Sequence, residues 1–237
     1  MWQPQRDRQP ELMDNPGIPA SLHRSALEGI GRVNLLSRTD AVLWRALRSV
    51  SPSRPHQPLT ILDIASGGGD SSIRLAQRFQ RSRIPVEIEG SDISPTAIEF
   101  AREQAKQRGV TQVKFTVHDV LTETLPDRGW DVVMCSLFLH HLSAEDGLAL
   151  LKVMRRAARQ LVIVDDLRRT RLGYWMAWLG CRILTRSPIV HVDGPLSVAG
   201  ALTSQEALDL AHQAGWQKPQ LKNHFPQRFL LSSRING

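Results

Sequence analysis

Ile61-Leu62-Asp63-Ile64-Ala65-Ser66-Gly67-Gly68-Gly69-Asp70 joins a short apolar run to three consecutive glycines. The run Leu59–Ala65 predicts a buried strand, and the pattern after the glycines predicts a helix over Ser71–Gln80. Glycines at the end of a strand let the backbone come close to a ligand, because they carry no Cβ. A tight turn also needs glycine for structural reasons alone, so this segment by itself is weak evidence for a binding site.

Short runs rich in β-branched residues alternate with longer helical patterns through the rest of the chain. The predicted strands are Val86–Ser91, Val113–Val117, Trp130–Ser136 and Gln160–Val164, and the predicted helices are Pro95–Arg108 and Ser143–Ala158. A closing strand pair is predicted near Gln220–His224 and Arg228–Ser233. Strands that alternate with helices pair in parallel through right-handed crossovers. The sequence therefore predicts an α/β fold with a doubly wound, mostly parallel sheet.

The N-terminal quarter differs from this alternation. Residues 1–20 hold four prolines and few apolar residues, which predicts an extended arm, whereas residues 21–50 have a helical period. Residues 51–58 are rich in proline and predict a linker. We therefore divide the chain into an arm with a helical cap (residues 1–58) and a main domain (residues 59–237).

An insertion over residues 167–203 follows the fifth predicted strand. It holds an apolar helix at Leu172–Leu184 and a predicted loop at Ser187–Pro195, and a further helix is predicted over Ser204–Ala214. The apolar helix is too short to span a bilayer and is interrupted by Arg182.

Composition and charge exclude several classes of protein. With 41% hydrophobic and 22% charged residues, the chain is not disordered throughout. Its two cysteines, Cys135 and Cys181, give neither a disulfide scaffold nor metal-ligand spacing, and no signal peptide is visible, so we expect a cytoplasmic protein. The net charge of +7 allows a nucleic-acid partner, but no dense Lys/Arg run or known binding module supports one.

Three acidic residues stand at the ends of successive predicted strands. Asp63 ends the first strand, Asp92 the second and Asp119 the third. A single acid in such a place is most often a helix cap or a solvated turn residue. A carboxylate at the end of the second strand can accept the hydroxyl protons of a ribose, and one at the third can accept from an adenine amino group. Three acidic residues on the same edge of a sheet are hard to explain as helix caps.

Together with the stretch from Asp131 to Leu142, these motifs resemble those of class I S-adenosylmethionine-dependent methyltransferases. The resemblance runs from about residue 59 to 165 and implies a seven-stranded sheet whose last strand is antiparallel. It also implies that the cofactor is S-adenosyl-L-methionine and that S-adenosyl-L-homocysteine is a product.

The same resemblance assigns roles to residues of this sequence. Asp63 and the loop residues Ala65, Ser66, Gly67 and Gly69 would hold the methionine end of the cofactor. The ribose and adenine would contact Asp92, Ile93, Asp119 and Val120, and the floor below the sulfonium would be formed by Cys135 and Ser136. One departure is that Ala65 occupies the place of the usual first glycine, which predicts a slightly different backbone path.

The residues after the fourth predicted strand exclude several acceptors. Cys135-Ser136-Leu137-Phe138 lacks the Pro-Pro-aromatic stretch of amino methyltransferases that modify bases. The residue before Cys135 is Met134 rather than the proline that a cytosine-modifying enzyme needs, and the paired glutamates of protein-arginine enzymes are absent. We therefore expect a small-molecule acceptor rather than nucleic acid or protein.

Histidines are the candidate general bases, because their pKa lies near neutral pH. We name His191 and His140 as catalytic candidates, with His191 narrowly preferred if Asp193 fixes its tautomer. His141 is a candidate for acceptor binding. Each of these histidines could equally be packed or solvated, and a desolvated phenol would need no base.

The insertion is the candidate acceptor lid. Tyr174, Trp175 and Trp178 give its helix an aromatic surface that suits a flat or long apolar acceptor. Two alternatives are that the helix packs on the sheet and that residues 172–184 make weak contact with a membrane surface.

The sequence thus predicts a methyltransferase that acts on a hydrophobic small molecule. We expect O-methylation of a phenolic, polyketide-like or quinone-type metabolite. The alternatives are C-methylation of such a metabolite, an RNA methyltransferase, and a partner protein that binds the cofactor without catalysis.

Overall fold

The computed structural model describes residues 5–15 and 17–235. In this part of the chain, seven strands form one sheet in the order β3-β2-β1-β4-β5-β7-β6. The strands are β1 (Leu59–Ile64), β2 (Val86–Asp92), β3 (Val113–Val117), β4 (Trp130–Ser136), β5 (Ala158–Leu167), β6 (Gln220–His224) and β7 (Arg228–Arg234). Neighbouring strands from β3 to β5 pair in parallel, and β7 is antiparallel to both β5 and β6. The predicted fold, including the antiparallel last strand, is confirmed.

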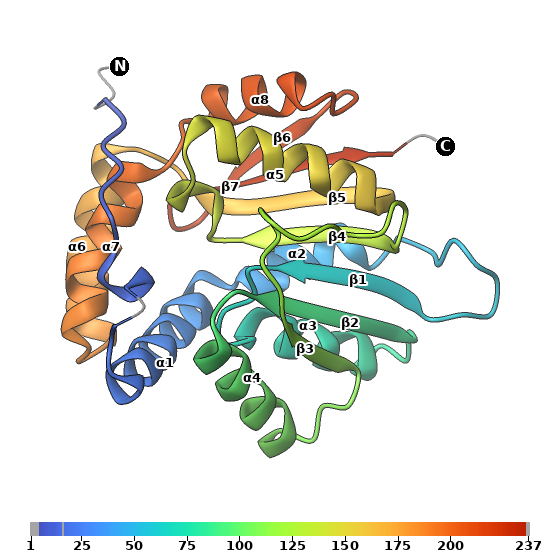
Figure 1. The fold of residues 1–237 in the computed structure, drawn as a ribbon, viewed down its shortest axis with the longest axis horizontal. Helices are drawn as coiled ribbons and strands as arrows, with labels where there is room; N and C mark the ends of the chain where they lie inside the picture. Colours follow the sequence, from blue (N-terminus) through green and yellow to red (C-terminus); the bar gives the residue numbers. More distant parts are fainter. Residues whose placement is uncertain (1–4, 16, 236–237) are drawn as a thin grey trace.

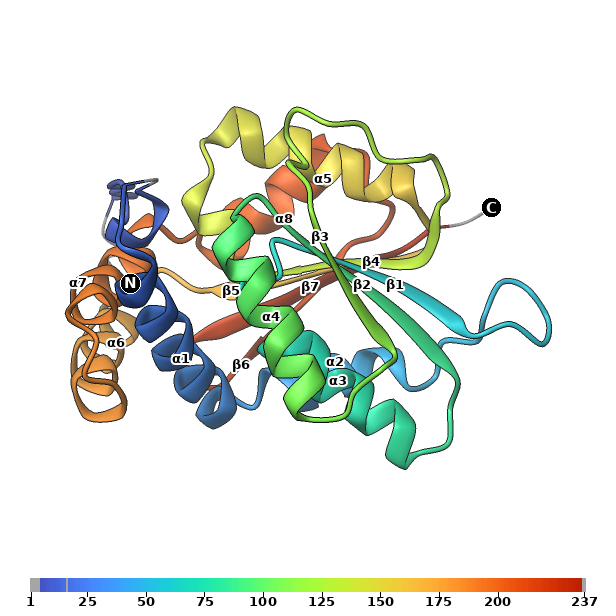
Figure 2. The ribbon, with the colours of Figure 1, turned by 60° about the horizontal axis from the view of Figure 1, so that its bottom comes forward.

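Helices cover both faces of the sheet (Figures 1 and 2). One face packs against α2 (Thr39–Leu47), α3 (Asp70–Arg81) and α4 (Pro95–Gln107), and the other packs against α5 (Ala144–Ala157) and α8 (Ser204–Gln213). Ser94 and Ser143 accept hydrogen bonds from backbone N–H groups in the first turns of α4 and α5, as expected of N-cap residues.

Residues of each strand alternate between the two cores. On β4, Val132 and Met134 pack with α2, α3 and α4, whereas Val133 and Cys135 pack with α5 and α8. Central strands with apolar residues on both faces are typical of a parallel sheet covered by helices, and this burial holds the strand ends in place.

The N-terminal segment runs from residue 5 without regular structure into the short 3-10 helix η1 (Leu12–Asp14), and α1 (Ala20–Ser37) follows. Residues 1–4 and Pro16 of the predicted arm lie outside the described residues. The helical period over residues 21–50 forms two helices, because Arg38 has a φ of 53° and turns the chain between α1 and α2.

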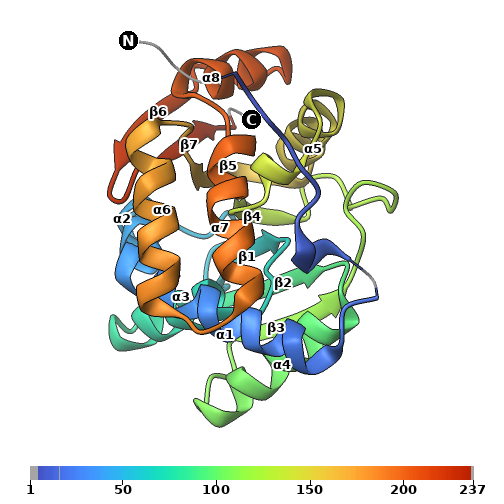
Figure 3. The same ribbon diagram turned by 90° about the vertical axis from the view of Figure 1, so that its left-hand side faces the viewer.

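The insertion after β5 forms two helices that pack side by side, α6 (Arg171–Leu184) and α7 (Pro188–Gly200) (Figure 3). The predicted loop at Ser187–Pro195 is wrong, since most of it belongs to α7. Pro188 stands at the start of the helix, where a missing N–H costs nothing. Ile189 and Val190 are buried against α1 residues, and this tertiary packing outweighs the helix-breaking effect of Pro195.

Pro195 removes one hydrogen bond from the interior of α7. The carbonyl four residues earlier belongs to His191, and it accepts a hydrogen bond from Arg182 of α6 at 3.5 Å.

The interpretation that the apolar helix packs on the sheet is also wrong. α6 packs on α7 and α1 instead, beyond the carboxyl ends of the strands.

Within the described ranges, 5–15 and 17–235, every helix is too short or too polar to cross a bilayer.

Candidate active site

The carboxyl ends of β1, β2, β4 and β5 lie at one edge of the sheet, which we call the carboxyl edge. α1, α6, α7 and the N-terminal segment lie beyond this edge (Figures 1 and 3). In parallel α/β sheets, the crevice at this edge is where ligands bind. A ligand is therefore expected at the carboxyl edge, where the strand-end residues identified from the sequence lie.

The glycine loop after β1 has three residues in the left-handed region, Ala65 (φ 54°), Gly67 (φ 53°) and Gly69 (φ 73°). Ala65 therefore adopts a backbone conformation that is typical of glycine. This conformation is sterically unfavourable for a residue with a Cβ, and few non-glycine residues adopt it. A Cβ at Gly69 would come within 2.5 Å of the Phe115 ring, so glycine is required there. The loop continues directly into α3, whose N-cap is Gly69.

Asp63 is buried at the end of β1. Its Oδ2 accepts a hydrogen bond from the Ser72 hydroxyl, and its Oδ1 has no partner among the described residues. Burial, aided by the charges of Asp70 and Asp92 and opposed by the Ser72 hydrogen bond, raises the pKa of Asp63 to about 7. The buried hydroxyls of Ser66 and Ser136 are also without partners in the described part of the chain.

Asp92 lies at the end of β2 and contacts the glycine loop. Its Oδ2 accepts from the Gly67 N–H at 2.8 Å and its Oδ1 from the Ser94 N–H at 2.9 Å. Burial raises the pKa of Asp92, and these two hydrogen bonds partly offset that effect. The next residue, Ile93, is 65% exposed. Asp92 and the loop are therefore brought together as the sequence predicts.

Asp119 follows β3 and is held within its own turn. Its carboxylate accepts from the Leu121 N–H at 3.0 Å and the Thr122 hydroxyl at 2.7 Å, and the Thr122 hydrogen bond lowers its pKa. Val120 beside it is buried. The turn lies next to the end of β2, because the His118 N–H donates to the Asp92 carbonyl.

Cys135 and Ser136 end β4 but have different surroundings. The Cys135 side chain is fully buried in the core with α5 and α8, and burial raises the pKa of its thiol. Its side chain therefore lies on the face of the sheet that α5 and α8 cover. The Ser136 hydroxyl is the side-chain polar group that β4 carries at its end.

His140 belongs to the 3-10 helix η2 (Leu139–His141), directly after β4. Its side chain is buried, and Nδ1 lies 2.6 Å from Oδ1 of Asp166 on β5. Asp166 also accepts from the His140 backbone N–H at 3.1 Å. Burial alone would raise the pKa of Asp166, but His140 beside it lowers it overall. The ring orientation of His140 is thus fixed by a carboxylate, an arrangement typical of histidines that act in catalysis or ligate metals.

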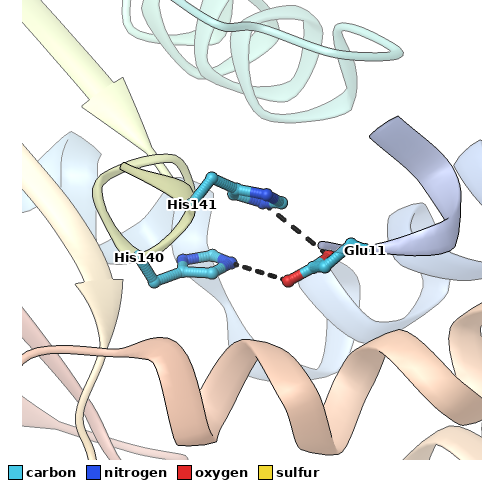
Figure 4. A group of neighbouring side chains, drawn as sticks. All are labelled: Glu11, His140 and His141. Carbon is cyan, nitrogen blue, oxygen red and sulfur yellow. Dashed lines mark ion pairs between the residues drawn. The ribbon is translucent and has the colours of Figure 1, made fainter. Parts of the chain in front are cut away.

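His141 stacks beside His140, with ring centroids 4.3 Å apart. Its Nδ1 lies 2.9 Å from Oδ2 of Asp14, and its Nε2 lies 3.8 Å from Glu11 (Figure 4). Burial by itself lowers the pKa of His141. The Asp14 hydrogen bond and the charges of Glu11, Asp14 and Asp166 outweigh burial and raise this pKa to about 9.

His191 and Asp193 do not form the predicted pair. His191 Nε2 lies 2.7 Å from the Thr185 carbonyl, at the turn between α6 and α7. Asp193 accepts hydrogen bonds from the backbone N–H groups of Leu12 and Met13, at 2.9 and 3.0 Å. The expectation that Asp193 fixes the His191 tautomer is wrong, because the N-terminal segment occupies its carboxylate.

The aromatic residues of α6 lie on its outer surface. Tyr174 and Trp178 are partly exposed, and Trp175 is 63% exposed. Arg182 stacks on the Trp178 ring at 4.2 Å.

Sequence reasoning missed three acidic residues near η2. Asp166 stands near the end of β5, where the strand-end rule applied to Asp63, Asp92 and Asp119 would have found it. Glu11 and Asp14 carry no such signal. They reach η2 because Arg6 and Arg8 donate to the carbonyls of Leu142 and His141, at 2.8 and 3.2 Å, and hold the N-terminal segment there.

Comparisons with known proteins agree with this geometry. The family model described as "Methyltransferase domain" matches residues 61–160, from β1 into β5. A demethylmenaquinone methyltransferase from Deinococcus radiodurans is 30% identical over 123 residues, which are 52% of this chain and 48% of that protein. A ubiquinone biosynthesis O-methyltransferase from Cereibacter sphaeroides is 30% identical over 172 residues, 71% of this chain and 64% of that protein. The chain spans about half the length of the demethylmenaquinone methyltransferases that it matches.

The fold is also that of a solved methyltransferase. A SAM-dependent methyltransferase from Aquifex aeolicus superposes with a TM-score of 0.65 and 16% identity, over 90% of this chain and 98% of that one. The sheet order, the glycine loop at the end of β1 and the matched region point to the same family. Residues 61–160 thus form a methyltransferase domain, and the chain has the fold of the class I S-adenosylmethionine-dependent methyltransferases.

Proposed function

We propose that the protein transfers a methyl group from S-adenosylmethionine to a hydroxyl of a hydrophobic small molecule, most simply a phenol of a quinol-type or polyketide-like metabolite. The observation that carries this proposal is His140, whose ring is oriented by the Asp166 carboxylate in the segment that follows β4. A positioned histidine can remove the proton of a hydroxyl as that oxygen is methylated.

The residues at the carboxyl edge fit the cofactor. The unpartnered Asp63 Oδ1, Ser66 hydroxyl and Ser136 hydroxyl are buried polar atoms that a polar ligand would satisfy. We propose that Asp63 and the loop residues from Ala65 to Gly69 hold its methionine end. Asp92 would bind the ribose hydroxyls, with Ile93, Asp119 and Val120 around the adenine. When bound, the cofactor supplies an electrophilic methyl group on a sulfonium.

The relatives support a quinol-type or related aromatic acceptor. Demethylmenaquinone methyltransferases and ubiquinone biosynthesis O-methyltransferases are both among them. We propose O-methylation, because a base matters most for a hydroxyl acceptor. The protein is expected to act in the cytoplasm.

An assay of purified protein with labelled S-adenosylmethionine and a panel of hydroquinones, catechols and polyketide-like phenols tests this function. We expect turnover with at least one of them and an O-methyl product by NMR. A C-methyl product would favour the alternative reaction. Cofactor binding without turnover on any phenol, but turnover on RNA, would contradict the proposal.

The pH dependence of cofactor affinity tests the role of Asp63. Its pKa of about 7 means that the carboxyl group is protonated at lower pH and must lose that proton before it can bind the cationic amino group of the ligand. S-adenosylhomocysteine affinity should therefore rise with pH, by up to about tenfold per unit below pH 7, and level off above it. Calorimetry between about pH 5.5 and 7.5 measures this. Asp63→Asn should bind more weakly and lose the slope, and an unchanged slope in that variant would contradict the assignment.

We further propose that residues 167–203 form the acceptor lid and that α6 contacts a lipid surface. Leu172, Trp175, Leu179 and Ile183 recur at helical spacing and are all more than half exposed. Arginines flank this stripe, which is typical of helices that lie in a membrane interface.

A vesicle sedimentation assay tests the lipid contact. The wild-type protein should bind anionic vesicles, and the double variant Trp175→Glu/Ile183→Glu should bind at least about tenfold more weakly, because two large apolar side chains lose their burial. Leu35→Glu, at an exposed position of α1, is the matched control. Equal binding by all three proteins would exclude this surface.

A further inference from the structure

The side chains of Glu11, His140 and His141 converge on one point (Figure 4). One ligand atom from each residue lies within 4.8 Å of the others. His140 Nε2 is 3.7 Å from Glu11 Oε1, and His141 Nε2 is 3.8 Å from Glu11 Oε2. Both separations are longer than a hydrogen bond. The two ring nitrogens and the Glu11 carboxylate therefore face one another without a direct hydrogen bond.

The other nitrogen of each ring is engaged by a carboxylate. Nδ1 of His140 lies 2.6 Å from Asp166 and Nδ1 of His141 lies 2.9 Å from Asp14. Where Nδ1 carries the proton that such a carboxylate accepts, the lone pair of the neutral ring is on Nε2, and on both rings Nε2 faces Glu11. Carboxylates that orient a histidine in this way are the usual outer partners of metal-ligating histidines.

Glu11 is likewise held in place. Its side chain is largely buried, and Oε1 accepts a hydrogen bond from the Ser197 hydroxyl of α7 at 2.6 Å. The neighbouring Leu12 and Met13 N–H groups donate to Asp193 on the same helix. The N-terminal segment thus delivers one carboxylate, on a fixed backbone, to two histidines that are 129 and 130 residues away in the sequence.

The distances suit a small cation. Metal–ligand bonds of about 2.0–2.1 Å in a tetrahedral site separate neighbouring ligand atoms by about 3.4 Å. Each ring nitrogen lies within a few tenths of an ångström of this separation from one oxygen of Glu11, at 3.7 Å from Oε1 and 3.8 Å from Oε2. One ligand atom from each of the three residues lies within 4.8 Å of the others, so modest side-chain movements would close the site around an ion. Two imidazole nitrogens and one carboxylate oxygen form a ligand set that zinc and neighbouring transition metals prefer, with at least one position left open.

We propose that Glu11, His140 and His141 bind a divalent transition-metal ion, with Zn²⁺ as the representative, whose open position faces the methyl acceptor. The role of the ion rests on the proposed function. It would act as a Lewis acid that lowers the pKa of a coordinated hydroxyl. With the ion bound, Nε2 of His140 would be a ligand rather than the base, so the hydroxyl would give its proton to solvent. The oxygen electron pair would form the new bond to the methyl carbon, and the C–S bond would break to leave a neutral thioether.

Metal titration of the full chain tests the site without any acceptor. Protein freed of metal by a chelator is titrated with Zn²⁺ in a calorimeter and with Co²⁺, whose visible absorption reports its ligands. We expect one ion per chain and a Co²⁺ spectrum typical of nitrogen and oxygen ligands in a four- or five-coordinate site. Glu11→Gln and His141→Ala should each weaken Zn²⁺ binding by about 100-fold or more, and Asp14→Asn by about 10–100-fold.

His212→Ala is the matched control, because His212 is an exposed histidine on α8 outside the cluster. It should bind Zn²⁺ like the wild type. Thermal melts without metal show whether each variant is folded. Wild-type protein that binds no stoichiometric Zn²⁺ or Co²⁺, or a folded Glu11→Gln/His141→Ala double variant that binds as tightly as the wild type, would overturn the proposal. S-adenosylhomocysteine binding, measured on the same samples, separates this outcome from a failure of the proposed function.

Discussion

His140→Asn is expected to lower methyl-transfer turnover by about 10²–10⁴-fold while cofactor binding survives, as befits the loss of a group that activates the acceptor. Asparagine can still donate a hydrogen bond to Asp166 from near the position of Nδ1, so the buried carboxylate keeps a partner. It has no equivalent of Nε2, the atom that faces Glu11. The measurement is kcat with a responsive phenol, beside calorimetry of S-adenosylhomocysteine.

His191→Ala provides the comparison for this prediction. The His191 ring is hydrogen-bonded to the Thr185 carbonyl, and Asp193 does not orient it. We therefore expect the turnover of His191→Ala to lie within a few-fold of the wild type. A large loss in His191→Ala together with near-normal turnover in His140→Asn would reverse the assignment. Near-normal turnover in both would mean that neither ring takes part, leaving proximity and desolvation to activate the acceptor.

Asp92→Ala is expected to weaken cofactor binding by about 2–4 kcal/mol, or roughly 30- to 1000-fold in Kd, because two ribose hydroxyls lose a charged acceptor. Asp92 also accepts from the Gly67 and Ser94 N–H groups, so the variant loosens the glycine loop. Asp92→Asn keeps an acceptor and should lose less affinity. Calorimetry with S-adenosylhomocysteine measures both variants.

Asp209→Ala, at an exposed position of α8, is the control for this series and should bind like the wild type. Thermal melts distinguish a folding defect from a binding defect. Unchanged affinity in a folded Asp92→Ala protein would rule out the ribose assignment.

The sheet could be predicted from the sequence because its information is local. Each strand is a short apolar run, and the glycines and N-cap serines mark where helices begin. The same local logic failed at Ser187–Pro195, where the prolines suggested a loop. Burial of Ile189 and Val190 against α1 decides the conformation there, and that contact depends on the packed fold.

The carboxyl edge was predictable to the extent that each residue sits on its own strand. Asp63, Asp92 and the glycine loop meet because parallel strands end together. The group around His140 depends on a segment more than a hundred residues away in sequence. No local pattern in Glu11 or Asp14 indicates that arginine side chains tie their backbone across η2.

The origin of Glu11 and Asp14 in the N-terminal segment has a consequence for how such proteins diverge. The region shared with the family spans residues 61–160 and includes the glycine loop and both histidines, whereas these two acids lie outside it. Exchanging a dozen N-terminal residues would therefore leave the sequence of the matched region unchanged. Under the proposed function, such an exchange would replace the acidic groups beside the histidines in a single step, which would make this short segment a unit for engineering a new acceptor preference.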